Sequence, residues 1–177
     1  SELGRAGVEE LAGQTASLLN VRPIESQVFS RQIAFNVLPK VGELEENGYS
    51  MLENGLVRES QKILDYPSLK ISPTILQAPV FFGHGMVLGV QTQKPIELEQ
   101  VRHLLRKSSA LEVVDEVTGG PTAVTEAAGN DAIYVGRLRA DISLECGITL
   151  WAVADNSHKG TALNGVQVAE ILVKDYL

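Results

Sequence analysis

The sequence predicts an α+β fold in which a mixed, largely antiparallel sheet is covered on one face by helices. Two observations lead to this fold class. Stretches with apolar residues at helical spacing are separated by single strands or strand pairs. The 177 residues, 44% hydrophobic and 21% charged, are also enough for one buried core. One face of such a sheet would remain bare, which indicates a dimer or a further domain.

The first half of the chain predicts two helices and a strand. The strand pattern alternates between apolar and polar residues and stops at Pro39. Ser50, with Glu53 three residues later, is typical of a helix start in which each side chain bonds the other's backbone. The expected elements are a helix over residues 8–19 ending near Asn20, a strand over 32–38 and a helix over 50–64.

The second half predicts most of the sheet. Pro95 is placed to open a helix, since proline fits the first helical position. Residues 118–131 are rich in Gly, Pro, Thr and Ala and predict a long surface loop. The remaining expected elements are extended runs over 70–77 and 84–93, a helix over 95–107, strands over 111–114, 132–139 and 147–154, and a helix from about 159.

Charge and cysteine content exclude several classes of protein. The net charge is −7, and no basic patch with interleaved aromatic residues is present, so we expect no nucleic-acid partner. The single cysteine allows no internal disulfide and no paired-cysteine zinc site, so we expect no metal and a reducing cytoplasm. No apolar run is long enough to span a bilayer. The chain begins without Met, and we expect it to be a piece of a longer protein.

Two side chains define the candidate site. His84 lies between Gly83 and Gly85, which leave it without bulky neighbours and allow unusual backbone angles. Such a histidine can face a cleft and titrate near neutral pH, as an acid/base does. Gln77 lies seven residues earlier, where a charge would be expected. The alternative for His84 is an ordinary turn or core histidine.

Other candidates have ordinary interpretations. The glycines of 83–89 do not have dinucleotide-fingerprint spacing, and the stretch that follows alternates like a strand. His103 is expected on a helix surface, and Cys146 is expected to be structural. His158 lies in a polar turn that either binds an anion or caps a helix. The residues alone therefore predict a globular α+β domain with one notable histidine.

Several stretches, found in order along nearly the whole chain, resemble the C-terminal catalytic and dimerisation domain of aspartate-semialdehyde dehydrogenases. The resemblance covers the opening Ser-Glu-Leu-Gly of 1–4, the Ile-Ala-Phe-Asn-Val-Leu-Pro of 33–39, the Glu-Ser-Gln-Lys-Ile of 59–63, the Val-Gly-Arg-Leu-Arg of 135–139 and the Asp-Asn-Ser-His-Lys-Gly of 155–160 with its continuation to Gln167.

The resemblance implies an NADP-dependent oxidoreductase of amino-acid biosynthesis, in which a cysteine thiolate attacks, a histidine passes protons and an arginine binds the substrate carboxylate. His84 falls on the catalytic histidine, and Gln167 on a glutamine that contacts the nicotinamide cofactor. Ser1 and Gly4 fall in a backbone segment beside that cofactor. The implied protein is a homodimer with NADP or NAD. Its N-terminal dinucleotide-binding domain is expected to lie outside this chain, residues 1–177, so no cofactor is expected for the chain alone.

The sequence departs from the family at the charged substrate contacts. Gln77 occupies the position of the carboxylate-binding arginine, while Leu52 and Gly55 occupy those of a glutamate and a phosphate-binding lysine. This pattern resembles the divergent Usg-type paralogues. The first hypothesis is a dimerisation domain with impaired or lost classical activity. The second is an active oxidoreductase on a less anionic aldehyde or acyl donor, and the third, a domain of N-acetyl-glutamyl-phosphate reductase type, fits the 135–139 and 155–160 stretches less well.

Overall fold

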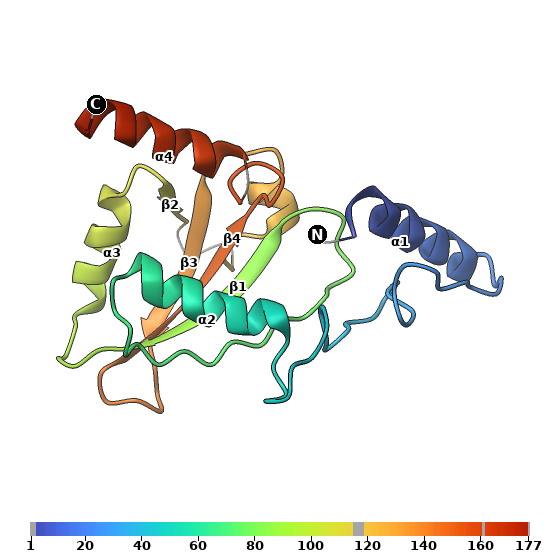
Figure 1. The fold of residues 1–177 in the computed structure, drawn as a ribbon, viewed down its shortest axis with the longest axis horizontal. Coiled ribbons are helices and arrows are strands. Elements are labelled where there is room, and N and C mark those ends of the chain that lie inside the picture. The colour runs from blue at the N-terminus through green and yellow to red at the C-terminus, as the bar shows by residue number, and fades with distance from the viewer. Residues whose placement is uncertain (1–2, 115–118, 161, 177) are drawn as a thin grey trace. The chain divides into compact units, whose positions relative to one another are not determined.

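The protein is described by a computed structural model that covers residues 3–114, 119–160 and 162–176. The chain forms two compact units, one up to Phe81 and one from Phe82 onward. Figure 1 shows the elements of both units along the chain. The boundary falls where the sequence shows no linker. Each unit is described by itself.

The first unit contains α1 (Gly4–Leu19) and α2 (Met51–Ile63). Helix α1 ends at Asn20 as predicted, but it begins four residues earlier than expected. It packs against the irregular segment that follows it through a small buried core of Leu11, Phe29, Ile33, Ala34 and Leu38.

A strand over residues 32–38 was predicted, and this prediction is wrong. The amides of Ile33 and Ala34 donate to Oε1 of the buried Gln14, at 2.9 and 3.2 Å, instead of to a neighbouring strand. Phe35 has a φ of 58°, which breaks an extended backbone. The backbone turns here: Ile33 and Ala34 are both buried, the next three residues are exposed, and only Leu38 forms a bridge, to Gln77.

The start of α2 follows its predicted capping pattern. The Ser50 hydroxyl accepts from Glu53 N at 3.2 Å, and the Glu53 carboxylate accepts from Ser50 N at 2.7 Å. The same carboxylate accepts from Ile75 N at 2.8 Å. This last bond ties the first turn of α2 to the segment that carries Gln77.

The second unit contains a four-stranded sheet in the order β1-β4-β3-β2. Strand β4 pairs antiparallel with both β1 and β3, and β2 pairs parallel with β3, so the predicted mixed, largely antiparallel sheet is confirmed. Its elements are β1 (His84–Gln91), α3 (Leu98–Lys107), β2 (Leu111–Val113), the π-helical turn η2 (Ala123–Ala127), β3 (Ile133–Ala140), β4 (Gly147–Ala154) and α4 (Ala162–Asp175).

Helix α3 covers one face of this sheet. It begins at Leu98, not at Pro95 as predicted, with Glu97 in the capping position. Its Val101 is buried against side chains of β3 and β4. The buried members of this core are Val101, Val135, Leu138, Ile148, Leu150 and Ala152.

The opposite face is partly covered by the segment predicted to be a surface loop. Thr118 lies outside the described residues, but Pro121 is fully buried, and its ring lies where a Gly136 side chain would extend. The Trp151 indole donates to Pro121 O at 2.7 Å. Pro121 and Ala127 therefore anchor the segment in the packed structure, while many of its described residues lie at the surface as expected.

In the described parts of the chain, no helix is both long and apolar enough to cross a membrane.

Candidate functional site

His84 is the first residue of the edge strand β1, where it pairs with Ala154 of β4. Gly83 before it has a φ of 88°, a conformation that favours glycine. A Cβ on Gly83 would lie 2.8 Å from the Ala123 side chain and 3.3 Å from Ala154 O. Position 83 therefore requires glycine for two reasons: the backbone has a positive φ, and neighbouring atoms leave no room for a side chain.

The imidazole of His84 is held toward its neutral form. His84 is exposed at the end of the strand, but partial desolvation by neighbouring protein still lowers the pKa of His84 below its ordinary 6.5, and the Asp155 carboxylate opposes this shift. At neutral pH the ring therefore carries a free nitrogen lone pair, and it can accept a proton as a general base does.

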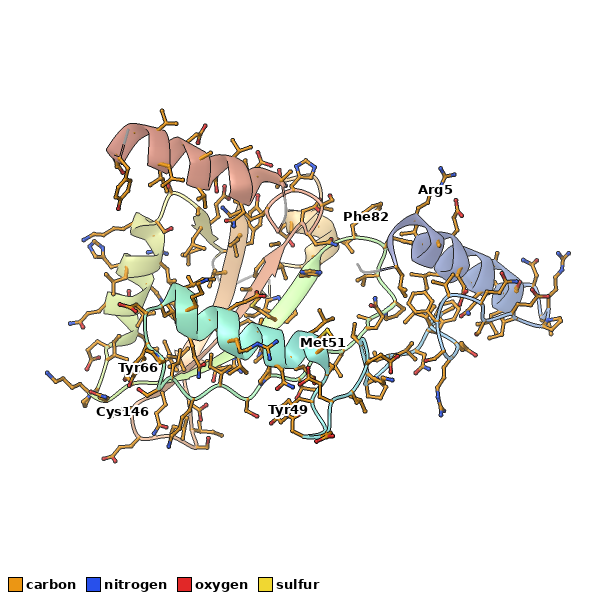
Figure 2. All side chains as sticks on the ribbon, viewed as in Figure 1. Arg5, Tyr49, Met51, Tyr66, Phe82 and Cys146 are labelled. Carbon is orange, nitrogen blue, oxygen red and sulfur yellow. The ribbon has the colours of Figure 1, made fainter. Side chains whose placement is uncertain are left out.

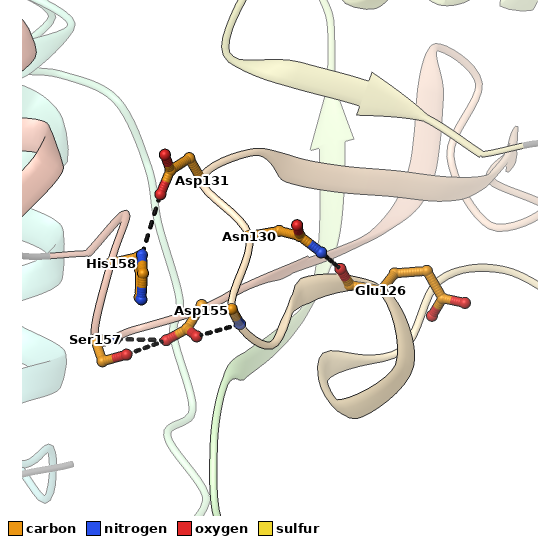
Figure 3. A network of polar contacts seen from close by, with 7 residues as sticks. Glu126, Asn130, Asp131, Asp155, Ser157 and His158 are labelled. Atoms are coloured by element: carbon orange, nitrogen blue, oxygen red, sulfur yellow. Dashed lines mark hydrogen bonds and ion pairs between the residues drawn. The ribbon is translucent and has the colours of Figure 1, made fainter.

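A polar turn follows β4 beside His84. Asp155 is 3% exposed, and its carboxylate accepts from Ser157 N at 2.7 Å, Ser157 Oγ at 2.6 Å and Gly129 N at 2.8 Å. Burial raises the pKa of Asp155, but these hydrogen bonds outweigh it and bring the pKa to about 2. Figure 3 shows this carboxylate at the centre of the turn, with His158 Nδ1 beside Asp131 at 3.1 Å.

Gln167 lies on α4 and is oriented by the same turn. Lys159 Nζ donates to Gln167 Oε1. An ammonium group can only donate, so the carboxamide must turn its oxygen toward Lys159 and its NH₂ group away. Gln167 therefore presents hydrogen-bond donors.

Gln77 belongs to the first unit. Its backbone exchanges hydrogen bonds with Leu38, both at 2.9 Å, which fixes its position. Its half-buried side chain donates to Ala78 O at a long 3.4 Å, so the amide is only weakly held. Leu52 and Gly55 lie in the first turns of α2, which Glu53 ties to this segment.

The remaining predicted positions are divided between the units. Gly4 opens α1 with a φ of 49° in the first unit, and Ser1 lies outside the described residues. His84 and Gln167 belong to the second unit, and Gln77 belongs to the first.

Cys146 is far from His84 in the second unit. The β1–β4 ladder runs from His84 opposite Ala154 to Gln91 opposite Gly147, and Cys146 directly precedes Gly147. Eight paired residues span roughly 23 Å, and Figure 2 shows Cys146 and Phe82 at opposite ends of β1. Cys146 is therefore not a nucleophile beside His84. Over the described residues, His, Cys, Asp and Glu side chains form no cluster able to hold a metal.

Two residues of this site were missed from the sequence. The side chains of Asp155 and Asn156 bond Gly129 and Gly83, which lie 26 and 73 positions away along the chain. The only local signal was their position in a polar turn directly after a strand.

Comparison with known proteins gives consistent matches. The family model "Semialdehyde dehydrogenase, dimerisation domain" matches residues 1–159. Aspartate-semialdehyde dehydrogenase 2 of Vibrio cholerae is 48% identical over 176 residues, which cover 99% of this chain and 52% of the relative. A USG-1 protein homolog of Azotobacter vinelandii is also 48% identical, over 98% of this chain and 52% of the relative.

The solved structures agree. A crystal structure of aspartate semialdehyde dehydrogenase II of V. cholerae, complexed with ASA, matches with a TM-score of 0.93 and 47% identity, over 98% of this chain and 51% of that one. The chain spans about half the length of the relatives it matches.

Proposed function

The chain belongs to the aspartate-semialdehyde dehydrogenase family, whose dimerisation domain it contains, and we propose that the classical activity of its protein is impaired or lost. The single observation that carries this proposal is Gln77, an uncharged amide where the resemblance implies an arginine for the substrate carboxylate. A guanidinium binds a carboxylate through two charged hydrogen bonds, and an amide offers no charge.

Two further replacements support the proposal. Leu52 and Gly55 stand where the resemblance implies a glutamate and a phosphate-binding lysine, and the Glu53–Ile75 bond ties their helix to the segment of Gln77. Each charged hydrogen bond contributes about 1.5–3 kcal/mol, so the loss of all of them weakens recognition of an anionic acyl phosphate by several orders of magnitude.

The test is an assay of the full-length protein for phosphate-dependent oxidation of aspartate semialdehyde with NADP. We expect turnover far below that of a normal dehydrogenase. Gln77→Arg, combined with Leu52→Glu and Gly55→Lys, is expected to raise kcat/KM. Gln93→Arg, at an exposed position after β1, is the control for an added cation and should have no effect. Turnover of the unmodified protein at a normal rate would contradict the proposal.

The second candidate is an active oxidoreductase on a less anionic aldehyde or acyl donor. The lowered pKa of His84 favours it, because a neutral imidazole can pass protons at pH 7. Gln77 would bond a neutral group of the substrate, such as an amide. This candidate requires a nucleophilic cysteine before Ser1, and it fails if the longer protein has none. It also predicts that His84→Gln abolishes turnover of an amide-bearing aldehyde.

The full-length protein is proposed to bind NADP or NAD through an N-terminal dinucleotide-binding domain. When bound, the cofactor supplies or accepts hydride. The donor set of this chain fits such a group: Lys159 turns the Gln167 NH₂ outward, where it can donate to a nicotinamide carboxamide. The segment from Ser1 to Gly4 would lie beside it.

The partner is proposed to be a second copy of the chain. Apolar side chains on both faces of edge strand β1 remain exposed, including Val87 at 68% and Met86 at 47%. Exposed apolar surface of this kind marks interaction sites. We place the homodimer in the cytoplasm, in agreement with the free Cys146.

A further inference from the structure

We propose that Asn156 is a positioning residue that fixes the backbone from which His84 projects. The proposal rests on the proposed function for the proton-transfer role of His84. Asn156 Oδ1 accepts a hydrogen bond from Gly83 N at 3.0 Å, and Gly83 directly precedes His84.

The bond lies directly beyond the last pair of the β1–β4 ladder. His84 pairs with Ala154, so the register would pair Gly83 with Asp155. The chain turns away there instead, and Asp155 O accepts from His158 N and Lys159 N within the turn. Thr92 N donates to Cys146 O, and hydrogen-bonded pairs alternate along an antiparallel ladder, so the last such pair of this register is His84 with Ala154. The ladder therefore offers Gly83 N no acceptor, and the Asn156 side chain supplies one.

Gly83 has little freedom to find another partner. It lies between Ala123 and Ala154 at distances that exclude a side chain, and its φ of 88° sets the direction in which the chain enters β1. The Gly83 N–H is part-buried, so loss of its acceptor leaves a donor that water cannot fully solvate.

Asn156 is itself held by a rigid neighbour. The buried Asp155 carboxylate bonds Ser157 and Gly129, which joins the turn to the segment after η2 (Figure 3). A fixed amide next to a fixed carboxylate therefore controls both the location of His84 and the distance between its ring and the Asp155 charge.

The experiment uses the full-length protein labelled with ¹³C at histidine Cε1, with His84 assigned by comparison with His84→Gln. In Asn156→Ala we expect the Gly83 amide to exchange with solvent roughly tenfold faster. The His84 ring should titrate closer to 6.5 than in the unmodified protein, because it becomes better solvated.

Asn130→Ala is the matched control. Asn130 lies in the same network but bonds Glu126 O at 2.6 Å, away from Gly83, and its variant should leave both readouts unchanged. Asn156→Asp keeps an acceptor oxygen and should retain Gly83 protection. If Asn156→Ala does not fold, Asn156→Ser, whose hydroxyl is too short to reach Gly83, gives the same comparison.

An unchanged His84 titration in a folded Asn156→Ala or Asn156→Ser protein would overturn the proposal. The proposed proton-transfer role of His84 is tested separately, by the activity of His84→Gln. Full activity of that variant would contradict the role, but it would not affect the conclusion that Asn156 changes the titration of His84.

Discussion

Asp155 shows how a buried charge can be stabilised by short-range hydrogen bonds. Its burial alone would favour the protonated acid, but the donors from Ser157 and Gly129 favour the carboxylate more strongly. Because the pKa in the folded protein, about 2, is below the ordinary 3.8, the unfolded chain binds more protons. Asp155 therefore stabilises the fold above pH 3.8, and this contribution is lost as the pH falls through about 2.

Asp155→Asn is expected to lower the free energy of unfolding at pH 7 by about 2 kcal/mol. Urea unfolding between pH 7 and pH 2.5 measures it, and the gap between variant and unmodified protein should narrow below pH 3.8. Asp131→Asn, in the same network but exposed, should have a much smaller effect. A gap that stays constant with pH would show that the charge is not responsible.

The elements that were predicted best carry their own local signals. Helix α2 begins at its capping box, and β3 and β4 lie within a residue of their predicted ranges. The incorrect strand over residues 32–38 failed for a physical reason: the partner of its backbone is a buried glutamine on α1, which no periodicity reveals. His84 could be found from its flanking glycines, whereas Asn156 could not, since its partner is distant in sequence.

Glu53 accepts hydrogen bonds both at the start of α2 and from the segment that carries Ile75. Hydrogen bonds from the backbones of Ser50 and Ile75 lower the pKa of Glu53, so the carboxylate stays charged. Glu53→Ala removes the acceptor of both amides and should lower the free energy of unfolding. Glu59→Ala, exposed on the same helix, should change stability by less than about 0.5 kcal/mol. Equal losses in chemical denaturation would contradict the role of the Ile75 bond.

The packing of Trp151 across β1 gives a second prediction for an element. A Cβ on Gly85 would lie 2.3 Å from the Trp151 ring, whereas one on Gly89, on the same face of the strand, would meet nothing within 4 Å. Gly85→Ala is therefore expected to destabilise the protein by about 1–3 kcal/mol.

Gly89→Ala is the control and should leave stability unchanged or raise it. Trp151 is the one tryptophan of the chain, so its fluorescence reports the displacement in Gly85→Ala directly. An unshifted emission spectrum in that variant would show that the indole does not lie across the strand.

At the scale of the whole molecule, the exposed apolar side chains of β1 are proposed to join two copies of the chain. Val87→Asp and Leu88→Asp place a charge on opposite faces of this strand. The variant on the face used in the dimer should weaken association by about tenfold or more, measured by sedimentation velocity of the full-length protein.

Ile142→Asp tests whether any new charge has this effect. Ile142 is 105% exposed in the loop between β3 and β4 and contributes to no strand, so the dimer should persist. If both β1 variants remain dimeric, the partner surface lies elsewhere.

The position of β1 at the end of the sheet order has a practical consequence for handling the chain. Among the residues that the structure describes, the outer side of this strand has no ladder partner in its unit. Its row of amide and carbonyl groups is flanked by the exposed Met86, Val87 and Leu88. Such an edge is a template for cross-β growth between molecules. Concentrated preparations in which this edge stays uncovered should form thioflavin-positive aggregates, and a lysine at position 87 should slow their onset.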